Sequence, residues 1–364
     1  MYVRRLELRQ LRRHEELTID LADRVNVVVG PNGAGKTTVL EAIDVLLSGS
    51  SFRASAVEQL VSRDHTEARI AGVAVVPPGR ELSLAVQLRS TGRAKVQLLN
   101  DKPVRRHTDL HRVVARTSFT SIDLDLVRGS PSARRSFLDE AVSRLSPRGD
   151  QIVESYERAV RQRNALLKQL KGRADPEGLA TLDVWDERLV TFGAELAQLR
   201  LAVLESTRAT LTDSYNAISG SSADGLVAEY HHNTPPEELA AALGQSRQID
   251  LLTGVTHVGP HRDDVHVRLG ERNLRLLGSS GEQRSAVLAW KISTHRAVQE
   301  AWGITPVLLL DDVFSELDER RCRAVLREFG DGQVVISAVA LPVGARVDNV
   351  ISLTSDAQLP AGDG

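Results

Sequence analysis

The sequence has no capacity for internal disulfides, because Cys322 is the single cysteine among 364 residues. A lone thiol cannot pair within the chain, which is typical of proteins that fold in a reducing compartment. Long apolar runs are also missing. None reaches the roughly 20 residues of a transmembrane helix, and the N-terminus has no apolar signal core. The sequence therefore predicts a cytoplasmic protein that does not bind or cross a membrane.

An excess of charge of one sign is missing as well, since the formal net charge at pH 7 is only −2. A protein that binds nucleic acid with most of its surface carries a large positive excess. Any DNA binding by this chain must therefore come from local basic patches. The composition, with 41% hydrophobic and 26% charged residues, is that of a globular protein.

The strongest motif lies at residues 30–37, where Gly-Pro-Asn-Gly-Ala-Gly-Lys-Thr matches the phosphate-binding pattern G-x-x-x-x-G-K-[ST]. Residues 24–29 before it predict a buried strand, and residues 36–47 after it predict a helix. The backbone N–H groups of such a loop surround the phosphates of ATP, Lys36 reaches the β- and γ-phosphates, and the Thr37 hydroxyl binds Mg²⁺. A plain glycine-rich turn is the alternative, which the flanking elements disfavour. The predicted ATP-binding residues are Gly30, Pro31, Asn32, Gly33, Ala34, Gly35, Lys36, Thr37 and Thr38.

A second motif lies far along the chain, where the apolar residues 305–310 lead into Asp311 and Asp312. A strand that ends in carboxylates is what a P-loop ATPase needs opposite its phosphate loop. Asp311 would hold Mg²⁺ together with Thr37, and Asp312 would orient the attacking water. Lys36 and Asp312 are therefore the candidate catalytic residues. Residues 315–318, directly after this strand, resemble the D-loop of ABC-type ATPases.

A third motif, Ser-Ser-Gly-Glu-Gln-Arg at residues 279–284, resembles the signature motif of ABC-type ATPases. In that architecture Ser279 and Gly281 of one subunit complete the γ-phosphate site of the other, which predicts a homodimer that forms with ATP. The alternative is an ordinary helix cap, with a serine N-cap and Glu282 in the first turn. The order of phosphate loop, signature, acidic strand and D-loop favours the signature.

The middle of the chain is helical in character. Residues 151–171 contain no glycine or proline, and their apolar positions recur at steps of three and four. Residues 182–203 repeat this pattern after a short loop. The two seams predict an antiparallel helical hairpin, with pairing to another molecule as the alternative.

The predicted fold is therefore an α/β, ABC-type P-loop ATPase head that is interrupted by a mostly helical lobe. We expect the first half of the head at residues 1–122, the lobe at residues 123–249 and the second half of the head at residues 250–364.

These motifs resemble the RecF family of bacterial recombination-mediator ATPases, which are related to SMC proteins. The likeness continues in residues 119–139, which look like the block entering the family's lobe, in residues 163–168, and in Gly-Pro-His-Arg-Asp-Asp at residues 259–264. His261 in the last motif suits either a functional role near the nucleotide or hinge, or a buried hydrogen-bonded histidine.

The resemblance implies a DNA replication and repair protein that binds DNA at gaps with single-strand/double-strand junctions. Such a protein works with RecO and RecR to load the RecA recombinase, and is tied to replication restart and the SOS response. It uses ATP and Mg²⁺, and its weak, DNA-stimulated ATPase acts as a switch.

A nucleotide-binding subunit of a transporter and an SMC-like structural tether are the alternatives. The long separation of Lys36 from Ser279 disfavours the first, and helices of about 20 residues would be short for the second.

The sequence departs from the family pattern at several positions. Ser121 and Ile122 stand where Pro-Glu is usual, Ser280 and Glu282 replace glutamines of the signature, and Pro31 replaces an acidic residue. Residues 337–339 lack the histidine of transporter switch loops. These departures leave ATP binding intact and bear on the kinetics.

The remaining prediction concerns DNA contacts. Basic residues in predicted loops or at helix starts are candidates for binding DNA phosphates, although each of them also suits a solvated surface charge. The candidates are Arg12, Arg13, Arg53, Arg105, Arg106, Arg134 and Arg135.

Overall fold

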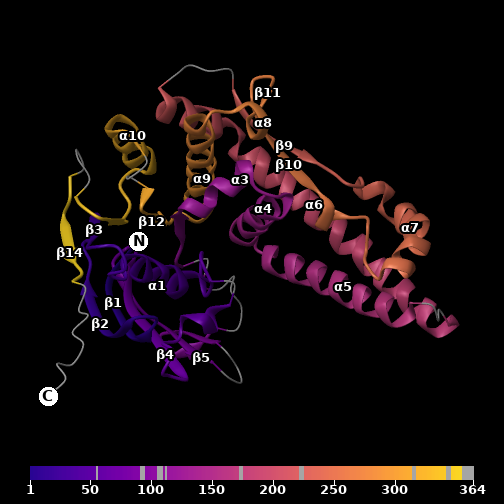
Figure 1. The fold of residues 1–364 in the computed structure, drawn as a ribbon, viewed down its shortest axis with the longest axis horizontal. Coiled ribbons are helices and arrows are strands. Elements are labelled where there is room, and N and C mark those ends of the chain that lie inside the picture. Colours follow the sequence, from indigo (N-terminus) through magenta and orange to yellow (C-terminus); the bar gives the residue numbers. More distant parts are fainter. Residues whose placement is uncertain are drawn as a thin grey trace, which may run out of the picture. The chain divides into compact units, whose positions relative to one another are not determined.

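The computed structural model describes residues 1–54, 56–90, 95–104, 110, 113–171, 175–220, 225–313, 317–341 and 346–354. The chain forms two compact units, drawn as ribbons in Figure 1. One unit combines Met1–Asp123 with Val298–Gly364, and the other is Leu124–Ala297. Within the described ranges, no helix combines the length and apolar character needed to cross a membrane.

The first unit is built on a five-stranded sheet in the order β14-β3-β13-β12-β8, in which every neighbouring pair is parallel. Its strands are short, and all but the edge strand β14 are largely buried, as expected for the inner part of a sheet that is covered on both faces. The carboxyl ends of parallel strands lie at one edge, so the residues that follow them meet there. The strands are β3 (Val25–Val29), β8 (Arg116–Phe119), β12 (Val307–Asp311), β13 (Val334–Ala338) and β14 (Asn349–Ser352).

A six-stranded antiparallel sheet in the order β2-β1-β4-β5-β6-β7 completes this unit. Helix α1 (Lys36–Ser48) contacts strands of both sheets, and eleven of its residues are buried. Burial on both sides explains why this helix is apolar beyond a single face. The other strands are β1 (Tyr2–Leu11), β2 (His14–Asp20), β4 (Glu67–Val76), β5 (Arg80–Arg89), β6 (Lys95–Leu99) and β7 (Lys102–Pro103), and α10 is Glu319–Phe329.

The second unit contains the helical hairpin that the heptad seams predict. It consists of α5 (Gly149–Leu170) and α6 (Pro176–Ser219), which the short connection between them makes antiparallel (Figure 1). Their buried seam residues form one cluster that includes Tyr156, Leu189 and Leu196, so the seam packs within the chain. Helix α6 is 44 residues long, far beyond the length of about 20 that the pattern predicts. The helix ends before Gly220, whose φ of 70° is a left-handed conformation that glycine adopts readily and that commonly terminates helices.

Further helices and a small sheet surround the hairpin within this unit. The further helices are α3 (Asp125–Arg128), α4 (Pro131–Leu145), α7 (Leu239–Thr253), α8 (Leu274–Leu277) and α9 (Ser280–Trp302). The strands β9 (Leu226–His231), β10 (Asp264–Leu269) and β11 (Arg272–Asn273) form an antiparallel sheet in the order β11-β10-β9.

The boundary between lobe and second half of the head differs from the expected one at residue 250. Residues 250–297 belong to the helical unit. The physical reason is that β10 pairs with β9 along six residues, and that Asp250 is bonded to Arg163 of α5. Neither partner can be recognised from local sequence patterns.

Arg163 joins three helices through a buried ion-pair network. Its side chain is fully buried, and its Nε lies 2.6 Å from Asp186 of α6. Its Nη1 lies 2.7 Å from Asp250 of α7, which is also fully buried. An ion pair of this kind contributes little relative to apolar packing, but removal of one partner leaves a buried charge uncompensated.

We predict that Arg163→Met destabilises the helical unit by about 3–5 kcal/mol. Urea unfolding followed by tryptophan fluorescence measures this, because Trp185 and Trp290 lie in the unit. Arg161→Met is the matched control, since Arg161 is exposed and, among the described residues, forms an ion pair only with Glu157 of its own helix. The control should change the free energy of unfolding by less than about 0.5 kcal/mol. Equal effects of the two substitutions would contradict a special role of Arg163.

Candidate nucleotide-binding site

The phosphate loop connects β3 to α1 and requires glycine at two positions. Gly33 and Gly35 have φ values of 82° and 94°, which other residues rarely adopt. A Cβ at Gly35 would also lie 2.3 Å from Nε2 of His14. The N-cap residue of α1 is Gly35, which has no side chain to cap the helix N-terminus. An anion such as a phosphate group suits this helix end, because the backbone N–H groups and the helix dipole point toward it.

Lys36 lies over this loop. Its Nζ donates hydrogen bonds to the carbonyl oxygens of Gly30 at 2.8 Å and Pro31 at 3.0 Å. The side chain is largely buried, so its position is fixed by the loop itself. The ammonium group is therefore placed at the helix N-terminus before any phosphate arrives.

The ends of β3, β12 and β13 bring the predicted magnesium residues together. The Thr37 hydroxyl donates to Oδ1 of Asp311 at 2.9 Å, although the two residues are 274 positions apart. The Ser337 hydroxyl donates to the same oxygen at 2.7 Å. This contact is possible because Asp311 and Ser337 are neighbours in the parallel pairing of β12 and β13.

These oxygen atoms fit a magnesium ion, which prefers carboxylate and hydroxyl ligands and keeps several waters or phosphate oxygens. Among the residues that the structure describes, no group of three or more histidine, cysteine or acidic side chains could hold a metal alone. Thr37 and Asp311 would thus supply part of the ligand shell, and nucleotide phosphates and water the rest.

Asp312 follows the magnesium carboxylate in an unusual backbone conformation. Its φ is 54°, and its N–H donates to Oγ of Ser337 at 3.0 Å. Asp312 lines a cavity of about 500 Å³ together with the phosphate loop. The other lining residues are Arg12, Arg13, Asn32, Gly33, Gly35, Lys36, Thr37, Thr38, Arg53, Ser337 and Val339.

Three arginines expected to contact DNA, namely Arg12, Arg13 and Arg53, thus line the nucleotide cavity. Arg12 is held by Glu41 of α1, whose carboxylate accepts hydrogen bonds from Nε at 2.7 Å and Nη2 at 2.9 Å. Glu41 is fully buried and also accepts from the Ser51 hydroxyl at 2.5 Å. The guanidinium of Arg12 is therefore committed to a buried carboxylate, which disfavours a DNA contact.

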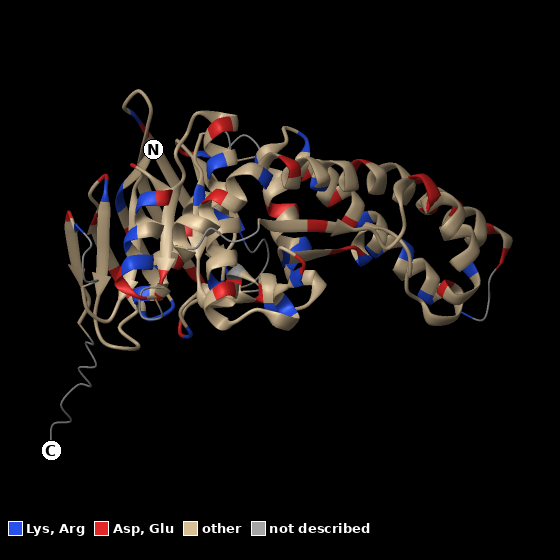
Figure 2. Cartoon of the chain, turned by 90° about the horizontal axis from the view of Figure 1, so that it is seen from above, with Lys and Arg blue, Asp and Glu red and all other residues tan. Residues whose placement is uncertain are grey.

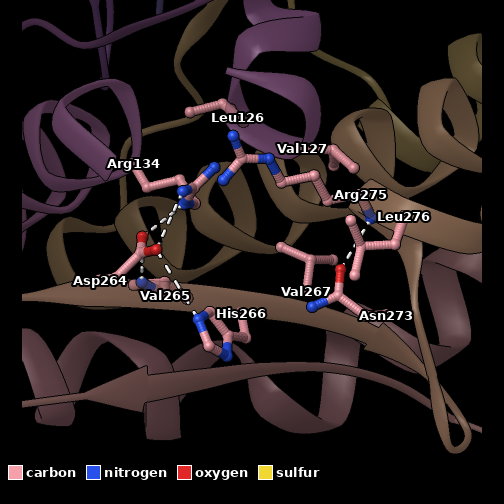
Figure 3. A pocket seen from close by; sticks show the side chains of 10 residues that line it. All are labelled: Leu126, Val127, Arg134, Asp264, Val265, His266, Val267, Asn273, Arg275 and Leu276. Carbon is pink, nitrogen blue, oxygen red and sulfur yellow. Dashed lines mark hydrogen bonds and ion pairs between the residues drawn. The ribbon is translucent and has the colours of Figure 1, made fainter. Parts of the chain in front are cut away.

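Arg134 does not suit the expected surface contact either. It is buried, and its guanidinium donates to both oxygens of Asp264 at 2.7 and 3.1 Å, as Figure 3 shows. Arg135 is half-buried and donates to the backbone oxygen of Asp263 at 2.7 Å. Arg105 and Arg106 lie outside the described residues. Figure 2 shows that basic and acidic residues are interspersed along the chain.

The signature segment begins α9 and forms a capping box. The Ser279 N–H donates to the Glu282 carboxylate at 2.8 Å, and the Glu282 N–H donates to the Ser279 hydroxyl at 3.3 Å. A hydrogen bond from Arg272 lowers the pKa of Glu282 to about 2. Within one chain, Ser279 and Glu282 thus form the ordinary helix cap that was the alternative to a signature motif. Ser279 remains exposed, as do its neighbours Leu276 (77%) and Leu277 (65%). The predicted D-loop lies partly outside the described residues, because Ser315 and Glu316 are not among them.

His261 is a partly buried, hydrogen-bonded histidine of the helical unit. Its Nδ1 lies 2.8 Å from the Tyr156 hydroxyl, and its Nε2 lies 3.0 Å from the backbone oxygen of Thr256. Burial lowers its pKa to about 4, so the ring is neutral at pH 7. The neighbouring Asp263 is also buried and accepts from the Tyr230 hydroxyl at 2.6 Å. This motif therefore connects the hairpin to the small sheet of the same unit.

Sequence reasoning did not identify two polar residues of the site. Ser337 enters the sequence analysis only through the histidine that residues 337–339 lack, and Glu41 only as one residue of the helix predicted at 36–47. Glu41 stands among apolar residues of α1, and this position is the signal that could have indicated a buried carboxylate with a basic partner. No local signal could have identified Ser337, because its role depends on the pairing of β12 with β13.

Comparison with known proteins connects this geometry to one family. The RecF/RecN/SMC N terminal domain model matches residues 2–359. A DNA replication and repair protein RecF from Cyanothece sp. is 35% identical over 91% of this chain and 89% of its own length. The RecF protein of Rhodococcus erythropolis is 34% identical over 94% of this chain and 90% of its own.

Solved structures agree with the sequence relatives. A structure described as the recombination mediator protein RecF with ATP in the RecFOR pathway is 27% identical, with a TM-score of 0.87 and coverage of 97% of this chain and 95% of that one. An SMC head bound to the C-terminal winged-helix domain of ScpA has a TM-score of 0.54 at 16% identity, covering 97% of this chain and 94% of that one, which shows a shared fold.

We predict that Lys36→Met weakens binding of a fluorescent ATP analogue on the order of tenfold to a hundredfold, because a charge-assisted contact to phosphate is lost. Lys95→Met is the matched control, since Lys95 also donates to a backbone oxygen, that of Gly49, and does not line the cavity. Equilibrium titration of both variants checks this. If Lys36→Met keeps the parent affinity for the analogue and the parent rate of ATP hydrolysis, the cavity is not the nucleotide-binding site.

Proposed function

The chain belongs to the RecF family within the RecF/RecN/SMC ATPases, and we propose that it is an ATP-controlled DNA clamp of DNA replication and repair. One observation carries this proposal. The phosphate-loop residue Thr37 and the strand-end carboxylate of Asp311 meet at 2.9 Å, beside a helix N-terminus whose N-cap residue is a glycine. This is the arrangement that binding of Mg²⁺ and a nucleoside triphosphate requires.

In the proposed reaction, the backbone of residues 30–35 and the ammonium group of Lys36 hold the phosphates in place. Thr37 and Asp311 supply oxygen ligands to magnesium, which when bound neutralises phosphate charge. Asp312 orients the attacking water and accepts its proton. Aspartate is one methylene shorter than the glutamate usual in transporter ATPases, and a misplacement of about 1 Å can cost a hundredfold in rate. We therefore expect this chain to hydrolyse ATP slowly. Binding of DNA or closure of the dimer would stimulate hydrolysis by helping to align Asp312 with the water.

ATP is proposed to assemble a homodimer in which the signature of one subunit covers the nucleotide of the other. The exposure of Ser279 and of the adjacent Leu276 and Leu277 supports this. Exposed leucines beside a polar helix N-terminus are common at interfaces between proteins. A two-fold head-to-tail arrangement buries both patches and both nucleotides.

DNA is the proposed partner of this dimer. By analogy with the family, the clamp acts at gapped DNA with single-strand/double-strand junctions and cooperates with RecO and RecR to load the RecA recombinase in the cytoplasm, within the SOS response. The ATP-bound relative is described in the RecFOR pathway, which supports this assignment. Of the proposed DNA-phosphate contacts, Arg13, Arg53 and Arg135 keep this role as candidates, together with Arg105 and Arg106.

We predict that Ser279→Arg prevents the ATP-dependent dimer, because a bulky cation would occupy the subunit contact. Sedimentation velocity with and without Mg-ATP measures the change. Ser132→Arg is the control, since Ser132 is also an exposed serine near a helix start of the same unit. Normal dimerisation of Ser279→Arg would show that the signature does not act across the interface.

We also predict that Asp312→Asn retains ATP-dependent dimerisation and lowers the rate of hydrolysis on the order of a hundredfold or more, because the proton acceptor is lost. Its dimer should persist longer than that of the parent protein. Asp311→Asn should instead weaken the binding of Mg²⁺ itself, because a carboxylate ligand is lost. Single-turnover hydrolysis and dimer lifetime are measured side by side. Hydrolysis by Asp312→Asn at the parent rate would place the catalytic base elsewhere.

A further inference from the structure

Ser337 lies at the carboxyl end of β13, between the two strand-end carboxylates. Its hydroxyl donates to Oδ1 of Asp311 at 2.7 Å and accepts the N–H of Asp312 at 3.0 Å. The residue is 1% exposed, so water does not substitute for these bonds. A serine hydroxyl is one donor and also an acceptor, and both capacities are used here.

The bond to Asp312 matters because of the backbone at that residue. A φ of 54° is uncommon for a residue with a side chain and persists where surrounding contacts hold it. The N–H bond to Ser337 is such a contact, and it sets the direction in which the Asp312 carboxylate leaves the strand. Loss of the hydroxyl would leave the backbone free to relax and to move this carboxylate.

The bond to Asp311 acts on the magnesium ligand. Oδ1 of Asp311 accepts hydrogen bonds from Thr37 of α1 and from Ser337 of β13, which approach from different elements and fix the plane of the carboxylate. Hydrogen bonds to the oxygens of a metal-binding carboxylate orient it and tune its affinity. One side chain on β13 is thus in contact with both acidic residues of the site.

We propose that Ser337 is a positioning residue that sets the geometry of Asp311 for magnesium and of Asp312 for water. This inference rests on the proposed ATPase function. An alanine at this position could make neither bond. Ser337 bonds to both acidic residues from β13, so a shift of that strand would move both carboxylates together.

The test is Ser337→Ala, which removes one oxygen atom from a buried strand and adds no bulk. The Mg²⁺ concentration for half-maximal binding of a fluorescent ATP analogue should rise on the order of tenfold, because a charge-assisted hydrogen bond to the ligand is lost. The rate of hydrolysis should fall on the order of tenfold to a hundredfold. Affinity for the analogue at saturating Mg²⁺ should stay within about twofold of the parent value.

Ser118→Ala is the matched control. Ser118 is also a buried serine, it lies on β8 at the other side of β12, and it does not line the cavity. A merely structural role would lower the melting temperature of both variants without changing the magnesium dependence of either. A second check, made at saturating Mg²⁺ so that the effect through Asp311 is removed, is the double variant Ser337→Ala with Asp312→Asn. It should hydrolyse ATP no more slowly than Asp312→Asn alone if the serine acts through Asp312.

Parent-like magnesium dependence and hydrolysis in Ser337→Ala would overturn the inference, as would equal changes in Ser118→Ala. Additive losses in the double variant would overturn the action through Asp312. If the parent protein does not bind Mg-ATP, the proposed function itself fails. If the parent binds it and Ser337→Ala behaves as the parent, the inference alone fails.

Discussion

The nucleotide site depends on one constraint, the alignment of parallel strands so that their carboxyl ends meet at the N-terminus of α1. Pairing of β3, β13 and β12 places Thr37, Ser337 and Asp311 within hydrogen-bond distance, although they come from opposite ends of the chain. A slip of one residue in this pairing would turn these side chains to the other face. Burial of α1 between two sheets fixes the register, and the polar site therefore relies on the apolar core beneath it.

The same principle of long-range pairing organises the helical unit through charges. Arg163 and Arg200 are buried arginines that each contact more than one element. Such ion pairs cost about as much in desolvation as they return, so their main contribution is to disfavour alternative packings of the helices. Arg200 also donates to the backbone oxygen of Pro260 at 2.8 Å, which ties α6 to the motif that contains His261. The polar residues of this motif therefore have a structural explanation.

Local sequence was sufficient for the elements whose signals are local. The strand, glycine-rich loop and helix at residues 24–48, the strand ending in Asp311 and the helical hairpin follow from periodicity and turn chemistry. What sequence could not supply was the partner of each charge. Arg12 and Arg134 looked like surface residues until the fold supplied Glu41 and Asp264, and the continuation of the helical unit to Ala297 depends on pairing between β9 and β10. The length of α6 exceeded its heptad pattern because its second half packs against different elements, including β9.

Sedimentation velocity of the protein with a fluorescent gapped duplex measures directly whether ATP closes two subunits on DNA. We expect Mg-ATP to produce a complex of two protein chains on each gapped duplex, and this complex to decay as ATP is hydrolysed. A continuous duplex of the same length should recruit fewer chains. A complex with one chain per DNA, or one that forms without ATP, would show that the protein is not an ATP-controlled clamp of two subunits.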